Sequence, residues 1–156
     1  TRAEGGLDLP ERFRQTSPER YCRRLLYSDP ENQWQAIVMA WAPGQGTALH
    51  DHAGLWCVEG VLEGRIDVTM YERLEELPDD VYRFARRDRV QAGMGSAGAL
   101  IPPFDYHVLA NALTDRPSIT LHVYGGEMDH CSIFEPQTDP SGDRYLRRQR
   151  TLSFDA

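Results

Sequence analysis

Short apolar runs separated by glycine and proline dominate the chain from residue 34 onward. The run Trp34–Trp41 is almost wholly apolar and ends before Pro43-Gly44. Four to eight apolar residues bounded by turn residues are typical of buried strands. Leu55–Leu62 and Arg65–Tyr71 form two further runs, and the Glu63-Gly64 step between them predicts a hairpin.

The same pattern continues toward the C-terminus. Further strands are predicted at Val108–Ala110, Ser118–Tyr124 and Cys131–Phe134, with Tyr145–Phe154 as a last strand or a packed tail. The segment Arg73–Arg89 is charged and contains Pro78-Asp79-Asp80, so we expect a long surface loop with one edge strand. Gly93–Gly98 is expected to be a flexible turn.

The first 20 residues differ from the rest because they are polar and rich in proline and glycine. We expect residues 1–20 to form a loosely attached arm, with one short helix near Pro18–Leu26. Elsewhere almost no helical period is visible, and many short strands with glycine and proline turns indicate an all-β sandwich or closed barrel. A length of 156 residues fits a single domain, residues 1–156.

Composition and charge exclude several classes of protein. The hydrophobic content of 40% is ordinary for a globular domain, and the net charge of −7 argues against a nucleic-acid partner. Three cysteines without regular spacing do not resemble a disulfide framework. No signal peptide or membrane-length apolar run is visible, so the expected location is cytoplasmic and no membrane partner is expected.

The candidate chemistry begins with His50-Asp51-His52. Two residues at i and i+2 of a strand point to the same face, about 6.8 Å apart along it. A third histidine from a distant segment, His107, could complete a metal site with three nitrogen ligands. Such a site keeps open coordination positions, which favours catalysis over a structural metal. The alternative is that the pair is simply two polar residues at a strand end.

The spacing around these histidines resembles the two half-motifs of cupins. The first half-motif is carried by Gly44, His50, His52, Cys57 and Gly64. The second is carried by Pro102, His107 and Asn111, with Phe104 where glycine is more common. Both half-motifs occur in order, about forty residues apart, within an all-β pattern. The resemblance implies an all-β cupin jelly-roll barrel with a short N-terminal arm or helix.

Cys57 stands where cupins usually carry a glutamate ligand. A three-histidine site without a carboxylate leaves the full charge of a divalent metal uncompensated. That favours an anionic ligand such as a thiolate, followed by dioxygen, whereas sites with a carboxylate are the commoner pattern of iron(II) oxygenases.

From Tyr21 to Phe134 the chain resembles the cysteine dioxygenase family, the thiol dioxygenase branch of cupins. The residues that carry the likeness are Tyr21-Cys22-Arg23, the run Trp41–His52, Cys57, the turn Val61-Leu62-Glu63-Gly64, His107 and Leu121-His122-Val123-Tyr124. The resemblance implies Fe(II) bound by His50, His52 and His107. It also implies the reaction: L-cysteine and O2 yield cysteine sulfinic acid, with both oxygen atoms transferred to sulfur.

The family also implies a thioether beside the metal, formed here by Cys57 and Tyr124. The alternative from the residues alone is a buried free thiol and a core tyrosine. Thr120, His122 and Tyr124 alternate along one predicted strand and therefore share a face, which we expect to be the interior. The family has a Ser–His–Tyr relay that orients the phenol; here Thr120 takes the place of the serine and His122 that of the histidine.

Arg23, with Tyr21 two residues before it, is the implied substrate-binding residue. In members that use cysteine, an arginine at this position binds the substrate carboxylate, and members that act on 3-mercaptopropionate carry glutamine. A guanidinium can bind a carboxylate through two parallel hydrogen bonds. The alternatives are a surface arginine, or a register in which Arg24 faces the site instead.

Three rival functions remain open at this point. The first is the same chemistry on 3-mercaptopropionate or another small thiol. The second is a cupin without enzymatic activity that binds a metal or a small ligand. The third is a different metal, because imidazole also suits zinc, nickel and copper. The sequence does not indicate the oligomeric state.

Overall fold

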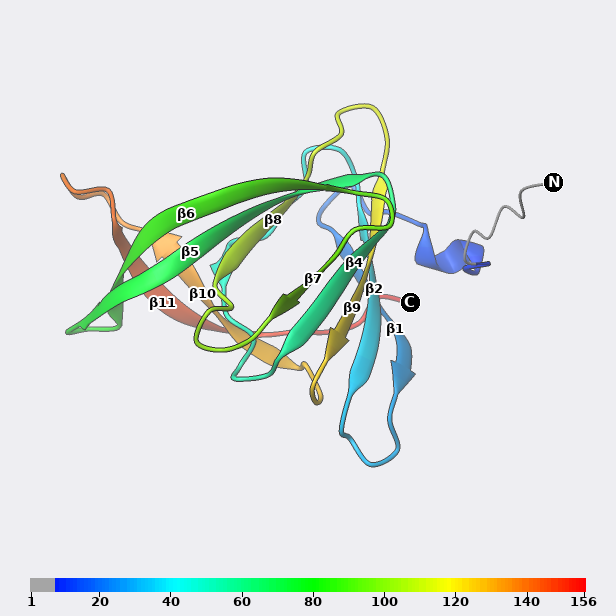
Figure 1. Ribbon diagram of the computed structural model, residues 1–156, viewed down its shortest axis with the longest axis horizontal. Helices are drawn as coiled ribbons and strands as arrows, with labels where there is room; N and C mark the ends of the chain where they lie inside the picture. The colour runs from blue at the N-terminus through cyan, green and yellow to red at the C-terminus, as the bar shows by residue number, and fades with distance from the viewer. Residues whose placement is uncertain (1–7) are drawn as a thin grey trace.

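The computed structural model describes residues 8–156 and consists of eleven strands and one short 3-10 helix (Figure 1). The elements in chain order are η1 (Glu11–Phe13), β1 (Cys22–Ser28), β2 (Gln35–Trp41), β3 (Leu49–His50), β4 (Cys57–Glu63), β5 (Arg65–Leu77), β6 (Val81–Gly93), β7 (Ala97–Leu100), β8 (His107–Asn111), β9 (Ser118–Tyr124), β10 (His130–Pro136) and β11 (Arg144–Thr151). The predicted all-β class is confirmed, and no helix within residues 8–156 has the length and apolar character needed to cross a membrane.

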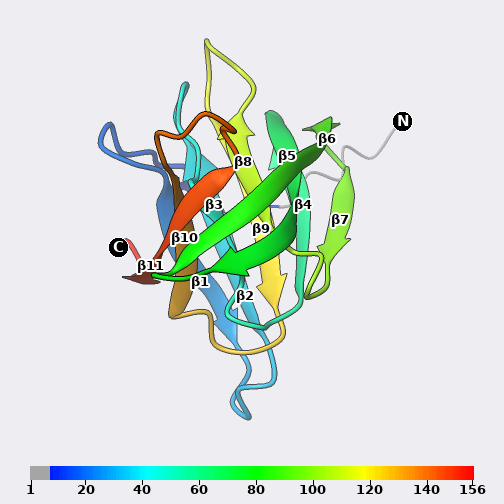
Figure 2. The same cartoon turned by 90° about the vertical axis from the view of Figure 1, so that its left-hand side faces the viewer.

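The strands form two antiparallel sheets that enclose a common interior (Figures 1 and 2). The first sheet has the order β1-β2-β9-β4-β7, and the second is a closed ring with the order β10-β11-β6-β5-β8-β3. The predicted strands at Trp34–Trp41, Val108–Ala110, Ser118–Tyr124 and Cys131–Phe134 correspond to β2, β8, β9 and β10. The sequence left Tyr145–Phe154 as either a last strand or a packed tail, and the structure has a strand there, β11, which ends at Thr151.

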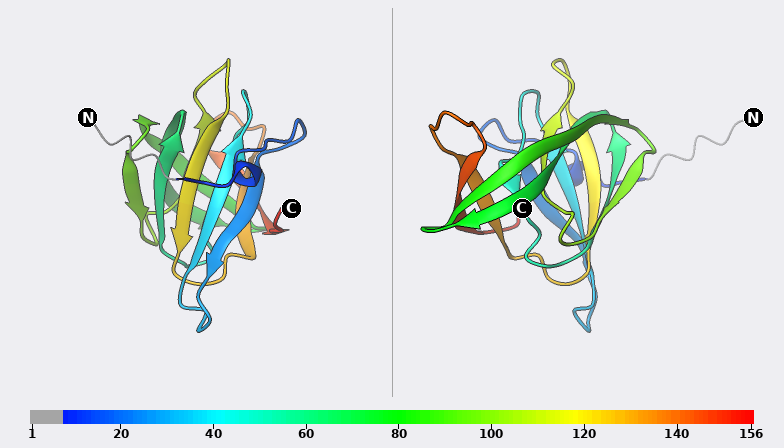
Figure 3. Two further views of the ribbon diagram at one scale, coloured as in Figure 1. Left: turned by 90° about the vertical axis from the view of Figure 1, so that its right-hand side faces the viewer. Right: turned by 60° about the vertical axis from the view of Figure 1, so that its left-hand side comes forward.

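Both faces of β2 are buried, which explains why its sequence is continuously apolar. Ile37, Met39 and Trp41 point into the interior between the sheets. Val38 and Ala40 point outward, where they pack with Leu9 and Phe13 of the N-terminal segment. Figure 3 shows η1 lying across the outer face of this sheet, over β1 and β2. A strand covered on both faces loses the alternation of a half-exposed strand.

The N-terminal segment therefore differs from the expected loose arm over the part that the structure describes. Leu9 is 4% exposed and Phe13 is 2% exposed. The helix expected near Pro18–Leu26 is wrong, because Cys22–Ser28 is the edge strand β1, paired with β2. Residues 1–7 of the expected arm lie outside the described residues.

The predicted hairpin around Glu63-Gly64 is also wrong. Strand β4 pairs with β7 and β9 in the first sheet, whereas β5 pairs with β6 and β8 in the second. The step between them carries the chain from one sheet to the other. Gly64 has a φ of +78°, and a Cβ there would lie 2.4 Å from Ser118 Oγ, so the crossing requires glycine.

The charged segment Arg73–Arg89 is not a loop but most of a long two-stranded ribbon, β5 and β6 (Figure 3). Its turn is the Pro78-Asp79-Asp80 step, where both aspartates have positive φ. The ribbon is charged because much of it is exposed, and ion pairs such as Arg87–Glu72 and Arg83–Glu75 join its two strands.

We expect Phe13→Ala to destabilise the protein by about 3 kcal/mol, because it removes a buried ring from the cluster on the outer face of the first sheet. Equilibrium unfolding in urea measures the change. Phe104→Ala is the matched control, because that ring is 76% exposed and its loss should change stability by less than about 0.5 kcal/mol. Equal unfolding midpoints for the two variants would show that the N-terminal segment does not stabilise the barrel.

Candidate metal centre

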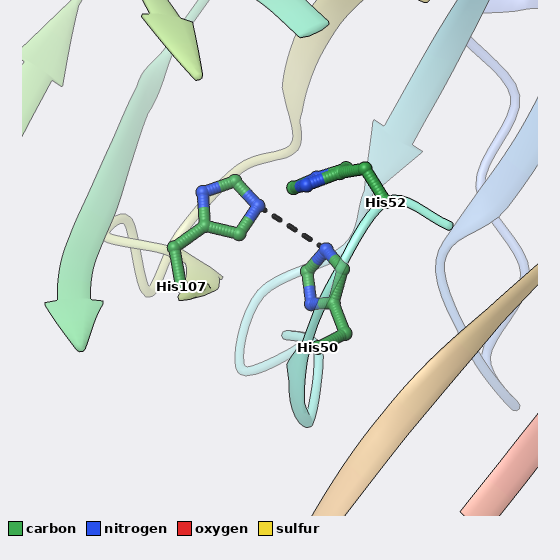
Figure 4. A group of neighbouring side chains, drawn as sticks. All are labelled: His50, His52 and His107. Atoms are coloured by element: carbon green, nitrogen blue, oxygen red, sulfur yellow. Dashed lines mark hydrogen bonds between the residues drawn. The ribbon is translucent and has the colours of Figure 1, made fainter. Parts of the chain in front are cut away.

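Three histidines meet at the junction of β3 and β8 inside the barrel (Figure 4). His50 ends β3 and pairs in register with His107, the first residue of β8, while His52 follows two residues later. The ring centroids are 4.7–5.0 Å apart, and one nitrogen of each ring lies within 4.8 Å of the others. The structure thus brings together the three residues that were predicted to bind a metal.

The residue between the first two histidines explains their direction. Asp51 donates its backbone N–H to the carbonyl of Ser132 on β10 and accepts the backbone N–H of Ser132 through Oδ1, at 2.8 Å. Asp51 therefore faces β10, and its two neighbours face the interior. His50 and His52 therefore point to the same side of the chain, as predicted, although strand β3 itself ends at His50.

Two of the rings are oriented through the nitrogen that points away from the cluster. His50 Nδ1 lies 2.9 Å from the carbonyl of Ala48, and His52 Nδ1 lies 3.1 Å from Oδ2 of the buried Asp105. A carbonyl or a carboxylate can only accept, so in each ring Nδ1 carries the proton. The Nε2 atoms of both rings are left as lone pairs, which is the tautomer that binds a metal.

The contact between His50 and His107 fits a cation. Their Nε2 atoms are 3.1 Å apart, as the dashed line in Figure 4 shows. Because Ala48 holds the proton of His50 on Nδ1, His50 Nε2 is the acceptor in this contact, and His107 Nε2 donates the proton when no metal is bound. A metal ion would take the place of that proton, and the proton of His107 would then lie on Nδ1. Three imidazole nitrogens suit iron as well as zinc, nickel and copper.

Burial keeps the rings of His50 and His107 neutral and therefore able to act as ligands. Desolvation, assisted by His52, lowers the pKa of His50 to about 3. Desolvation, followed by the neighbouring His50 and His52, holds the pKa of His107 well below its usual range. Metal ligands must be deprotonated, so the site is ready for a cation at neutral pH.

The ligand group contains no carboxylate. Within residues 8–156, the cluster of metal-ligating side chains is limited to His50, His52 and His107. Cys57 belongs to a second, adjacent group with Glu59 and His122. A divalent cation in the three-histidine group would keep its full charge, as the sequence indicated.

A small cavity of about 30 Å3 adjoins the histidines. Four residues line both this cavity and a larger polar groove of about 600 Å3 on the surface, namely Tyr21, Arg23, Arg150 and Leu152. The groove is therefore the side from which a small molecule would reach the metal centre. Arg150 was not found by the sequence reasoning, because its segment carries no motif.

The structure distinguishes the two candidate arginines of β1. Arg23 is 3% exposed, lines the cavity and donates to the carbonyls of Met128 and Ser153. Arg24 points to the opposite face, where it donates to the carbonyls of Gln15 and Ala156. In this structure Arg23, and not Arg24, therefore lines the cavity beside the histidines. Tyr21 also lines the cavity, and its ring stacks on Trp41 at 4.5 Å.

Cys57 and Tyr124 lie opposite each other on β4 and β9. Both are buried, at 1% and 3% exposure. Burial raises the pKa of the Cys57 thiol, with a further contribution from Glu59, while a hydrogen bond with Tyr124 opposes the shift. Burial also raises the pKa of Tyr124 well above its usual range, so the phenol keeps its proton.

A hydrogen-bonded chain runs along the interior face of β9. Trp41 Nε1 donates to Thr120 Oγ1 at 2.9 Å, and Thr120 Oγ1 lies 2.8 Å from His122 Nε2. Thr120, His122 and Tyr124 share the interior face, as predicted. The rings of His122 and Tyr124 are stacked with their centroids 6.2 Å apart, and no hydrogen bond joins them among the described residues. Orientation of Tyr124 by His122 therefore stays a prediction.

Two interior carboxylates were not identified from the sequence. Asp105 hydrogen-bonds His52, and Glu59 places Oε1 3.2 Å from His107 Nδ1 and Oε2 3.7 Å from His122 Nδ1. Burial raises the pKa of Glu59 to about 8. The alternation Cys57, Glu59, Val61 along β4 was a usable signal, because it places an acid on the same face as two core residues.

Comparisons with solved structures identify the fold as the cupin double-stranded β-helix. A protein from Thermus thermophilus superposes with a TM-score of 0.55 at 19% identity, over 78% of this chain and 97% of that one. A cupin 2 domain-containing protein from Halorhodospira halophila superposes with a TM-score of 0.52 at 17% identity, over 82% and 77%.

Sequence comparisons point to one family within this fold. Cysteine dioxygenase type 1 of Homo sapiens is 24% identical over 123 residues, which is 76% of this chain and 58% of that protein. The Danio rerio protein of the same name is 22% identical over 129 residues, which is 81% and 62%. The chain thus aligns with about three fifths of the length of these relatives. A family model described as "Cysteine dioxygenase type I" matches residues 9–137. With the three histidines assembled as above, the chain belongs to the cysteine dioxygenase type I family.

Proposed function

We propose that the protein is an iron(II)-dependent dioxygenase that oxidises the thiol of L-cysteine to cysteine sulfinic acid. The observation that carries the proposal is a buried arginine that lines the same cavity as a metal site made only of neutral ligands. When bound, iron(II) would bring the thiolate and dioxygen together and mediate electron transfer between them. Both oxygen atoms of O2 end on sulfur, so the reaction needs no external reductant.

The guanidinium of Arg23 supports an anionic substrate. It is almost fully buried, and its hydrogen-bond acceptors are two backbone carbonyls, which carry no charge. The nearby carboxylate of Asp155 is engaged by the Arg20 side chain and by the backbone N–H of Arg23. A buried charge without a counter-ion is unfavourable, and a substrate carboxylate would supply one. Of the five N–H groups of the guanidinium, two are used by the carbonyls, which leaves donors for a carboxylate.

The remaining residues would orient the substrate. Tyr124 keeps its proton and lines the cavity, so its phenol can donate a hydrogen bond to bound substrate or oxygen. Tyr21 would form the cavity wall beside Arg23. A thioether between Cys57 and Tyr124 would form with loss of the thiol hydrogen and one ring hydrogen, with dioxygen as the oxidant during turnover. The cross-strand pairing of the two residues supports this link.

The small cavity beside the histidines favours a small thiol, and Arg150 and Leu152 line both this cavity and the surface groove through which it would enter. Arg23 would bind the carboxylate of cysteine or of 3-mercaptopropionate. The amine distinguishes these substrates, and steady-state rates with both thiols decide between them.

Replacing His50, His52 or His107 by alanine should remove most bound iron and abolish sulfinate formation, because a site with two of its three ligands binds weakly. Metal analysis of the purified protein and oxygen uptake with L-cysteine measure both effects. His130→Ala is the matched control, because His130 is exposed and contacts Asp129 at the surface. Full iron occupancy in any of the three variants would remove that residue from the ligand set.

Arg23→Gln should lower kcat/KM for L-cysteine at least tenfold, since hydrogen bonds to charged groups contribute about 1.5–3 kcal/mol. Cysteamine, which lacks the carboxylate, should be oxidised equally by the variant and the wild type. Arg24→Gln serves as the control, because Arg24 faces away from the cavity. Unchanged cysteine kinetics in Arg23→Gln would transfer the role to another arginine, and Arg150 is the next one that lines the cavity.

Cys57→Ser should stay folded and bind iron, with reduced but measurable sulfinate formation, because the thioether would tune Tyr124 and not transfer oxygen. After many turnovers, intact mass of the wild type should show a deficit of two hydrogens that the variant lacks. A wild-type mass without that deficit would disprove the cross-link and leave the dioxygenase assignment intact.

A further inference from the structure

Glu59 is a carboxylate placed inside the barrel, directly behind the metal site. It lies on the interior face of β4 and pairs in register with His122 on β9. Its side chain is only 14% exposed. Glu59 lines a second, mainly apolar cavity and does not line the one that contains Arg23. The carboxylate is therefore separated from the proposed substrate cavity by the histidines.

His107 needs an acceptor where Glu59 lies. Because Nε2 of His107 faces the other histidines as a ligand, the proton of this ring belongs on Nδ1. His107 Nδ1 is one of two buried side-chain polar atoms without a hydrogen-bond partner among residues 8–156. Glu59 Oε1 lies only 3.2 Å away, although the two groups are not aligned as a hydrogen bond. A small rotation of either side chain would close the bond.

The tautomer of His122 follows from its neighbours and leads to the same carboxylate. The indole N–H of Trp41 can only donate, so the hydroxyl oxygen of Thr120 accepts it. The hydroxyl proton of Thr120 is then free to be donated to His122 Nε2, which lies 2.8 Å away. That leaves the proton of His122 on Nδ1, which faces Glu59 Oε2 at 3.7 Å. Two imidazole N–H groups thus converge on one carboxyl group, and a cation held by the histidines would favour its ionised form over the protonated form that burial alone favours.

We propose that Glu59 is the positioning residue of the metal centre: it accepts the Nδ1–H of His107 and connects this ligand to His122, Thr120 and Trp41. The inference rests on the proposed function only in taking the three histidines as the iron ligands. A carboxylate behind a metal-bound imidazole fixes the ring and makes its nitrogen a stronger donor. Glu59 therefore increases the affinity for the metal and favours the more highly charged oxidation state.

The same residues could be taken for a second metal site, because Cys57, Glu59 and His122 offer three ligand atoms close together. The hydrogen-bonded chain argues against it, because a proton on His122 Nδ1 blocks coordination there. The Cys57 thiol is also kept protonated by burial, whereas a ligand must be a thiolate. One metal ion per chain is therefore expected.

The test compares Glu59→Leu, Glu59→Gln and a matched control on the same strand, Glu63→Gln, whose side chain is 44% exposed and pairs with Arg14. The measurements are anaerobic titration with Fe(II), the reduction potential of the bound iron, and thermal unfolding of the metal-free protein. We expect Glu59→Leu to weaken Fe(II) binding 10–100-fold. Glu59→Gln should weaken it less, because its amide oxygen still accepts one N–H. Both should shift the potential to more positive values, and the metal-free Glu59→Leu protein should unfold no earlier than the wild type.

Wild-type affinity and potential in Glu59→Leu would overturn the proposal. So would a second equivalent of Fe(II) that binds the wild type and is lost in Glu59→Gln. If Glu59→Leu failed to fold, the potential of Glu59→Gln, which keeps the side-chain volume, would decide the matter. None of these measurements uses a thiol. A protein that binds iron through Glu59 and oxidises no thiol would refute the proposed function and leave this inference standing.

Discussion

The constraint on which this site depends is the placement of three imidazoles close together in a buried space. Desolvation makes a charged ring unfavourable there, so the pKa values of His50 and His107 are lowered and their nitrogens remain lone pairs. The Nε2 atoms of His50 and His107 lie 3.1 Å apart, with one proton between them that a cation would replace. The barrel therefore holds the ligand nitrogens close together before a metal binds, which is how a folded scaffold contributes affinity.

The closed second sheet provides the precision that this arrangement needs. His50 and His107 are fixed relative to each other by the register between β3 and β8, and Asp51 ties the end of β3 to β10. Arg23 belongs to the other sheet, on its edge strand β1. The cavity thus lies between the two sheets, with His50 and His107 on one and the buried guanidinium of Arg23 on the other. The proposed substrate, a thiol that also carries a carboxylate, would match this separation of charges.

The metal ligands could be predicted from the sequence because the required information is local. The i, i+2 spacing of His50 and His52 sets a common face, and His107 stands in a recognisable half-motif. The partners of β4 and β5 could not be predicted, because Gly64 predicts a turn but not which sheet the chain enters next. The charged ribbon of β5 and β6 was mistaken for a loop because its polarity reflects exposure, which is set by tertiary structure. Glu59 was missed because its partners come from β8 and β9, far away in the sequence.

The three-histidine group lacks a carboxylate ligand, but acidic side chains lie directly behind two of its histidines. Cys57 occupies the position where cupins usually have a glutamate, yet two carboxylates lie one imidazole further out, Asp105 behind His52 and Glu59 behind His107. When ionised, carboxylates at that distance would partly offset the charge of a cation without occupying a coordination position. The open coordination positions would remain free for further ligands. A carboxylate ligand in the group itself would provide the same charge and would compete with them. Placing the acids outside the ligand group is therefore a physical solution for a centre that holds a cation and keeps coordination positions open.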